Sequence, residues 1–89
     1  MGIYIHDPEA TLAYGFDWTN ALASGVTIAS STWSADEGID LGVSEIDGNI
    51  TSVLVSGGTY KTNYVITNHV VFSDGAADDR SHTLKVRHR

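Results

Sequence analysis

The sequence contains no cysteine, a single proline at Pro8 and no long apolar run. The lack of cysteine excludes a disulfide framework, a cysteine-based zinc site and a thiol nucleophile, and it is typical of a protein made in a reducing cytosol. A membrane-spanning helix needs roughly 18–20 apolar residues, and the opening segment MGIYIHDPEA lacks the features of a signal peptide. Helical periodicity is also nearly absent, because the one candidate, residues 17–23, is a single turn long.

Basic residues are scarce and unevenly placed. Lys61 is the only Lys or Arg before position 80, whereas all eleven Asp and Glu residues lie at or before Asp79. Residues 1–79 therefore carry a net charge of −10 and residues 80–89 carry +4, which gives −6 overall. An acidic body repels the phosphates of nucleic acids and anionic lipids, so we expect neither as a partner. The basic end is expected to neutralise the chain's own acidic face or to dock on an acidic partner.

The chain does contain many short apolar segments separated by Gly, Asp, Asn and Ser. In Leu12–Trp18 every second residue is apolar, which favours a strand with one buried face and places Trp18 in the core. Gly15, on the opposite face, is expected to mark a bulge. Comparable segments follow, with a turn signal about every 8–12 residues, a spacing typical of all-β domains.

Six or seven short strands without a helix for a parallel crossover predict antiparallel sheets. We therefore expect an all-β fold, an immunoglobulin-like antiparallel β-sandwich of about seven strands, with a small barrel as the alternative. Eighty-nine residues allow one domain. We assign residues 1–10 to a polar N-terminal arm and residues 11–89 to the sandwich.

The segment NYVITNHVVF, residues 63–72, contains a candidate tyrosine corner. Tyr64 follows shortly after Gly57 and Gly58, and Ile66 comes two residues later. In immunoglobulin-like folds a tyrosine at this place turns its hydroxyl back to the preceding loop, and the residue two positions later is in the core. An ordinary strand tyrosine with an exposed hydroxyl is the alternative.

The histidines and aspartates near this segment do not form a recognisable metal site. His69 and His82 flank the acidic loop almost symmetrically, so they could face each other across a hairpin, although a solvent-facing polar pair is the commoner arrangement. Asp74, Asp78 and Asp79 lack the closing Glu of a calcium loop and are expected to form a solvated tip. We predict no metal site and no cofactor.

The sequence also lacks a catalytic motif. Ser81, His82 and Asp79 supply the residue types of a nucleophilic triad, but neighbours on a strand point to opposite faces. No Gly-x-Ser-x-Gly elbow and no phosphate-binding glycine loop occurs. We predict no catalytic residue and no enzyme activity.

The last strand, SHTLKVRHR, is amphipathic. Leu84 and Val86 share one face, and the other face carries the basic residues, which suit an acidic protein surface or acids on a neighbouring strand. Trp33 lies at a strand end beside a polar loop, where it could be either an interface anchor or a core residue. The predicted interface residues are Tyr4, Trp33, Lys85, Arg87 and Arg89.

Two long segments carry a family resemblance. DPEATLAYGFDWTNALASGVTIASSTW (residues 7–33) and GGTYKTNYVITNHVVFSDGAADDRSHTLKVR (residues 57–87), in this order, resemble the small fiber–tail adaptor proteins of tailed bacteriophages. The matching residues are Asp7, Leu12, Tyr14, Asp17 and Trp18, then Gly57, Gly58, Thr59, Tyr64, Ile66, Thr67 and Asn68, and finally Asp79, Arg80, Ser81, Lys85, Arg87 and Arg89.

The resemblance implies an immunoglobulin-like virion protein without catalysis or cofactor. Its partners would be tail, neck, connector or fiber proteins, with several symmetric copies in the particle, after synthesis in the bacterial host cytoplasm. A second hypothesis is a carbohydrate-binding or adhesion module on the virion surface, with Trp33, Asp36 and Glu37 as its binding residues. A hydrolase or metal protein is the third.

Overall fold

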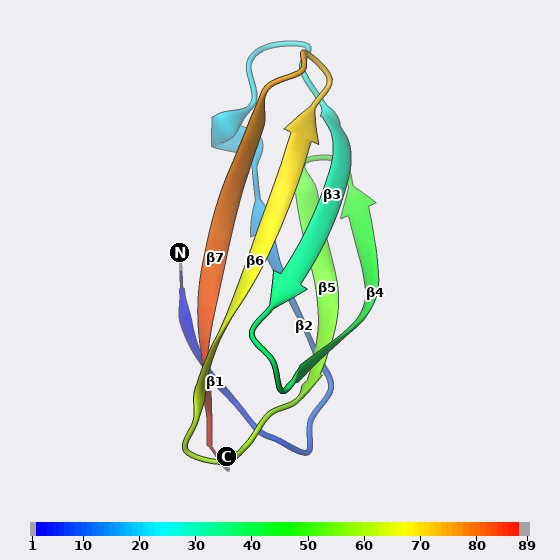
Figure 1. Cartoon of the computed structure of the whole chain (residues 1–89). Coiled ribbons are helices and arrows are strands. Elements are labelled where there is room, and N and C mark those ends of the chain that lie inside the picture. The colour runs from blue at the N-terminus through cyan, green and yellow to red at the C-terminus, as the bar shows by residue number, and fades with distance from the viewer. Residues whose placement is uncertain (1, 88–89) are drawn as a thin grey trace.

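The computed structural model describes residues 2–87, which form two packed β-sheets (Figure 1). The sheet orders are β1-β7-β6-β3 and β2-β5-β4. None of the described residues forms a helix long and apolar enough to cross a membrane. The predicted all-β sandwich is therefore confirmed. Its elements are β1 (Ile3–His6), β2 (Leu12–Asp17), the 3₁₀ turn η1 (Thr19–Ala21), β3 (Ile28–Ala35), β4 (Ile39–Asp47), β5 (Ile50–Gly57), β6 (Asn63–Phe72) and β7 (Ala77–Val86).

The strand orders resemble those of immunoglobulin domains. The order β2-β5-β4 corresponds to strands B-E-D, and β3-β6-β7 corresponds to strands C-F-G of the constant-type domain. The first strand differs, because β1 pairs with β7 instead of joining the other sheet. The immunoglobulin-like assignment stays a prediction, which these orders support.

The pairing of β1 corrects the expectation of purely antiparallel sheets. β1 runs parallel to β7, with Ile3 opposite Thr83 and His6 opposite Val86. The crossover argument fails here because the two strands come from the two ends of the chain, so the rest of the domain serves as their connection. Ile3–His6, expected in a polar arm, is thus part of a sheet, and His6 is fully buried. The boundary after residue 10 stays a prediction.

The core lies between the two sheets and follows the period-two pattern of the strands. Along β6 every second residue is buried, so Ile66 and Val70 are fully enclosed. On β7 the same holds for Leu84 and Val86. Each fully buried aliphatic side chain of this size stabilises the fold by about 1.5–3 kcal/mol. The buried core residues form two clusters, and the half-buried Trp33 packs against both of them.

Gly15 has a different role from the expected bulge. The β2–β5 register runs without interruption through Gly15, and the irregularities lie in β3 and β4. A Cβ atom at Gly15 would lie 2.2 Å from the carbonyl oxygen of Thr51. Glycine is therefore required because the two backbones approach closely, and the bulge prediction was wrong.

Candidate functional site

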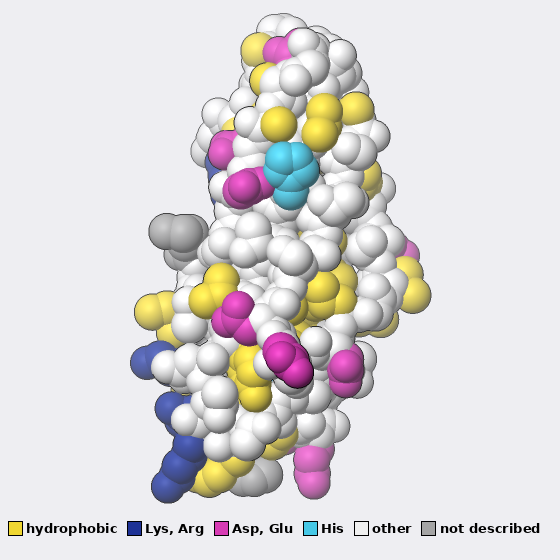
Figure 2. All heavy atoms as spheres, in the orientation of Figure 1, with side chains coloured by type: hydrophobic (Ala, Val, Ile, Leu, Met, Phe, Trp, Pro, Cys, Tyr) yellow, Lys and Arg dark blue, Asp and Glu magenta, His cyan; other side chains and the backbone are white. Residues whose placement is uncertain are grey.

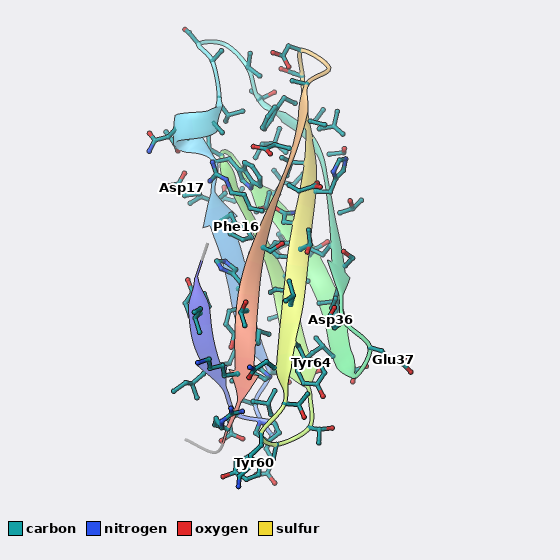
Figure 3. The ribbon with its side chains drawn as sticks, turned by 60° about the vertical axis from the view of Figure 1, so that its left-hand side comes forward. Phe16, Asp17, Asp36, Glu37, Tyr60 and Tyr64 are labelled. Carbon is teal, nitrogen blue, oxygen red and sulfur yellow. The ribbon has the colours of Figure 1, made fainter. Side chains whose placement is uncertain are left out.

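Tyr64 ties the start of β6 to the loop before it. Its hydroxyl accepts a hydrogen bond from the backbone N–H of Thr59 at 2.9 Å, and its ring is buried. Hydrogen bonds from Thr59 favour the phenolate and lower the pKa of Tyr64. Ile66, two residues later, is fully buried. Figure 3 shows Tyr64 at the same end of the molecule as Tyr60.

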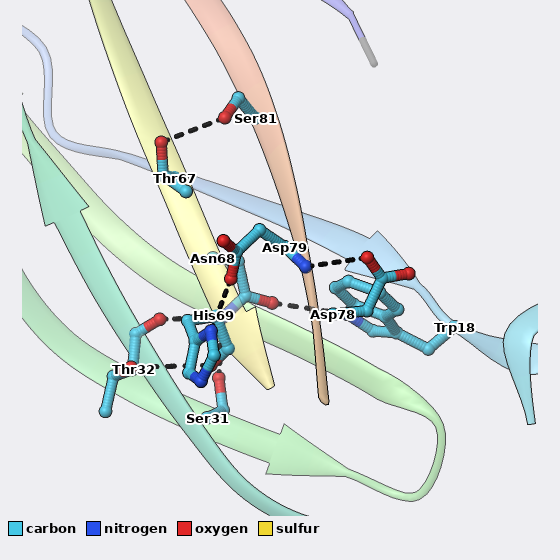
Figure 4. A network of polar contacts seen from close by, with 9 residues as sticks. All are labelled: Trp18, Ser31, Thr32, Thr67, Asn68, His69, Asp78, Asp79 and Ser81. Atoms are coloured by element: carbon cyan, nitrogen blue, oxygen red, sulfur yellow. Dashed lines mark hydrogen bonds and ion pairs between the residues drawn. The ribbon is translucent and has the colours of Figure 1, made fainter. Parts of the chain in front are cut away.

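A buried polar network joins the two sheets (Figure 4). Trp18, which follows β2 and is fully buried, donates its indole N–H to Thr51 Oγ1 at 3.0 Å and to Asn68 Oδ1 at 3.2 Å. Asn68 Nδ2 donates in turn to Ser31 Oγ at 2.8 Å and to the carbonyl oxygen of Thr32 at 3.0 Å. The network satisfies polar groups that would destabilise the fold if they were buried without partners. The network has a structural role, because the side chains of Trp18, Thr51 and Asn68 are all fully buried.

A cluster of rings holds β1 against the sandwich. His6 Nδ1 lies 2.8 Å from the hydroxyl of Tyr14, and the exposed Tyr4 packs on the rings of Tyr14 and His82. His82 stacks on Phe16 with ring centroids 3.9 Å apart. These contacts fix the first strand at the side of the sandwich.

His82 itself is a buried crosslink. Its Nε2–H donates to the carbonyl oxygen of Gly15 at 2.8 Å, and Nδ1 accepts from the N–H of Gly2 at 3.1 Å, which is the pattern of a neutral imidazole. Burial disfavours the charged ring and lowers the pKa of His82. The residue that raised the possibility of a metal ligand thus connects β7, β2 and the N-terminal segment.

His69 and His82, which could have faced each other across the hairpin, do not do so. In the β6–β7 register His69 lies opposite Asp79 and His82 lies opposite Ile66. His69 Nδ1 pairs with the carboxylate of Asp79 on the exposed face. Residues 2–87 contain no group of three or more His, Asp and Glu arranged to hold a metal ion.

The remaining polar residues of this hairpin are also occupied by local contacts. Asp74 accepts a hydrogen bond from the N–H of Ala76 at 3.0 Å and so caps the turn. Ser81 pairs with Thr67 at 2.9 Å, whereas its neighbour His82 is buried on the opposite face. Ser81 and His82 therefore diverge as strand parity predicted.

Lys85 and Arg87, which we call the basic strip, lie at the side of β7. Lys85 is exposed and stands opposite Asn63 on β6 and Ile5 on β1, so neither neighbouring strand offers it an acid directly opposite. The only ion pair among residues 2–87 is His69–Asp79. Figure 2 shows the Lys and Arg side chains gathered along one side, beside hydrophobic side chains. Arg89 lies outside the described residues.

Arg80 does not belong to this strip. Its guanidinium group lies 4.2 Å from the ring centroid of Trp18, and it donates to the carbonyl oxygen of Asp17 at 3.2 Å. Arg80 therefore lies over Trp18 in the polar network. In the sequence it contributes to the net charge of +4 of residues 80–89, but in the structure it is not part of the basic strip.

An open groove adjoins the basic strip. It has a volume of about 640 Å³ and runs between the edge strands β1 and β2, so we call it the β1–β2 groove. Sequence reasoning missed it, because parity identifies a buried face but not which strands lie at the sandwich edges. Its lining residues are Ile3, Tyr4, Ile5, Leu12, Ala13, Tyr14 and Arg87.

Trp33 and its acidic neighbours do not form an open aromatic platform. Trp33 is half-buried, stacks on Phe16 at 5.9 Å, and its buried indole N–H has no hydrogen-bond partner among the described residues. Asp36 accepts a hydrogen bond from the N–H of Val65 at 2.9 Å. Glu37 is exposed in the β3–β4 loop next to it (Figure 3).

The described residues thus offer two features suited to contact with another protein, the basic strip and the β1–β2 groove. A search of curated proteins finds no significant match to the chain. A family model matches residues 6–85, which is most of the sequence. The chain therefore belongs to the family described as podophage GP4 fiber-tail adaptor protein gp77.

Proposed function

We propose that this protein is a non-enzymatic adaptor that links or decorates tail, neck or fiber proteins of a podophage particle in several symmetric copies. Membership of a fiber–tail adaptor family makes it a structural component of the virion tail that binds other virion proteins. We further propose that it uses no cofactor, contacts neither nucleic acid nor membrane, and is made in the host cytoplasm.

The observation that carries this proposal is the position of the basic strip at the rim of the β1–β2 groove. Ile3 and Ile5 are 68% and 54% exposed there, and Arg87 lines the same groove. An apolar centre with a charged rim is the common anatomy of a protein–protein interface. Charges at the rim steer and orient the partner more than they add affinity.

Charge reversal of the basic strip tests the proposal. Phage particles are assembled with the double variant Lys85→Glu/Arg87→Glu, and the occupancy of the adaptor is measured by quantitative mass spectrometry of purified virions. We expect reduced occupancy while the isolated domain keeps its wild-type unfolding midpoint, because neither residue makes an ion pair within residues 2–87.

The matched control places added negative charge elsewhere. Asn20→Glu/Ala23→Glu changes two exposed residues in and after η1, far from the basic strip (Figure 1). This variant should be incorporated normally. Unchanged occupancy of the Lys85→Glu/Arg87→Glu variant would rule out the role assigned to the basic strip.

A further inference from the structure

The two sides of the sandwich carry opposite chemistry, and the first side is that of β1. β1 is one of the two outer strands of its sheet. The carbonyl groups of Gly2 and His6 accept hydrogen bonds from β7, so the alternate residues Ile3 and Ile5 direct their backbone groups to the free edge. This side therefore offers unpaired strand backbone, exposed isoleucines and the basic strip.

The other side is that of β4, which lies at the edge of the second sheet opposite to β2 (Figure 1). β4 contains three exposed acids, Asp40, Glu45 and Asp47, which we call the acidic edge, and it contains no Lys or Arg. Its pairing with β5 is interrupted between Leu41 and Ser44, where Val43 is 66% exposed. An apolar side chain is therefore presented between carboxylates.

The acidic edge and the basic strip are not neutralised within the part of the chain that the structure describes. The ion pair His69–Asp79 is the only one there, and it involves neither group. Ion pairing between copies is thus open to both groups. Edge strands with free backbone and exposed apolar residues are sites at which another strand adds.

We infer that the β1–β2 groove is the docking site for the β4 side of a second copy of this chain. Val43 of one copy would enter the groove of the next, and Asp40 and Glu45 would face Lys85 and Arg87. This inference rests on the proposed function, whose symmetric copies it connects. The contact is heterologous, since each copy uses different surfaces on its two sides. Heterologous contacts build closed rings or open helical filaments.

Two one-sided variants test this contact. Ile5→Glu/Arg87→Glu disables the β1 side, and Val43→Glu disables the β4 side, because it places a charge where the groove is apolar. The two altered sides are then both acidic and repel each other. Analytical ultracentrifugation across a concentration series should show assemblies for the wild-type chain and monomers for each variant alone. An equimolar mixture should form a heterodimer and nothing larger, because only one functional pair of surfaces remains.

Controls keep the experiment decisive. Far-UV circular dichroism and thermal unfolding establish that each variant folds, and if Ile5→Glu prevents folding, the surface variant Lys85→Glu/Arg87→Glu replaces it. Asn20→Glu/Ala23→Glu adds the same kind of charge in and after η1, away from both sides, and should assemble as the wild type does.

The inference is overturned if the wild-type chain stays monomeric up to millimolar concentration, if either variant still assembles alone, or if the mixture remains monomeric. Particle occupancy separates this result from the proposed function. A chain that is present in virions but fails the mixing test contradicts only the contact between copies. A chain that assembles in solution but is absent from virions contradicts only the adaptor role.

Discussion

The indole N–H of Trp18 lies 3.2 Å from the side-chain oxygen of Asn68, and this hydrogen bond connects the end of β2 to the middle of β6 in the opposite sheet. Asn68 is fully buried and also binds Ser31 and Thr32 on β3. A one-residue slip of β6 would turn Asn68 to solvent and break all of these bonds. The network therefore helps to specify the register of the sheet as well as to stabilise it.

Asn68→Ala should lower the free energy of unfolding by about 2–4 kcal/mol, because it removes a hydrogen-bond partner from four residues, among them the fully buried Trp18 and Thr51. Urea unfolding monitored by tryptophan fluorescence measures the change. Asn63→Ala, at an exposed position of the same strand, is the matched control and should change stability by less than about 0.5 kcal/mol. A loss below about 1 kcal/mol for Asn68→Ala would show that water replaces the network without penalty.

Tyr64→Phe should lower the free energy of unfolding by about 0.5–1.5 kcal/mol. The substitution keeps the buried ring but removes the hydroxyl that accepts the hydrogen bond from Thr59. Tyr4→Phe is the control, because the Tyr4 side chain is exposed and contributes ring contacts that phenylalanine retains. Equal stabilities of the two variants would contradict the structural role of the Tyr64 hydroxyl.

Gly58→Ala should destabilise the domain by about 2–4 kcal/mol, through both backbone strain and overpacking. Gly58 has φ +97°, and a Cβ atom there would lie 2.7 Å from Val86 Cγ2. Gly48 also has a positive φ, +60°, but has open space around it. Gly48→Ala should therefore lower the free energy of unfolding by only about 1 kcal/mol. Chemical denaturation of both variants separates strain from clash, and equal losses would contradict the packing contribution.

Much of the core and of the outer faces could be predicted from alternation alone. Period two placed Trp18 inside and Lys85 outside, and the tyrosine-corner pattern placed Ile66 in the core, as the structure has them. Parity says which face a side chain occupies but not which strand lies next to it. The parallel β1–β7 pair and the β1–β2 groove, which depend on the arrangement of the strands, were therefore not accessible.

The possible pairing of His69 with His82 does not occur, for a related reason. Register depends on where a turn closes, and the β6–β7 turn closes early, with the N–H of Phe72 donating to the carbonyl oxygen of Ala76. β7 consequently begins at Ala77, and Asp78 and Asp79 are strand residues rather than part of a loop. This shift brings Asp79, not His82, opposite His69.

The stability of the domain should fall as the pH decreases through the range in which histidine titrates. Burial lowers the pKa of His82 below its ordinary value of 6.5. The unfolded chain therefore binds a proton before the folded chain does, so protonation favours unfolding. The contribution of His82 is fully present above pH 6.5 and declines at lower pH until the folded-state pKa is passed. Protonation of Nδ1 would also remove the acceptor for the N–H of Gly2.

His82→Gln isolates this effect, because glutamine can hydrogen-bond but does not titrate. Urea unfolding of both proteins at pH 8 and pH 5 should show a larger loss of stability for the wild type. The rings packed on His82 belong to Tyr4 and Phe16, and the other histidines, His6 and the exposed His69, are present in both proteins. Parallel losses in the two proteins would show that His82 does not control the acid sensitivity of the domain.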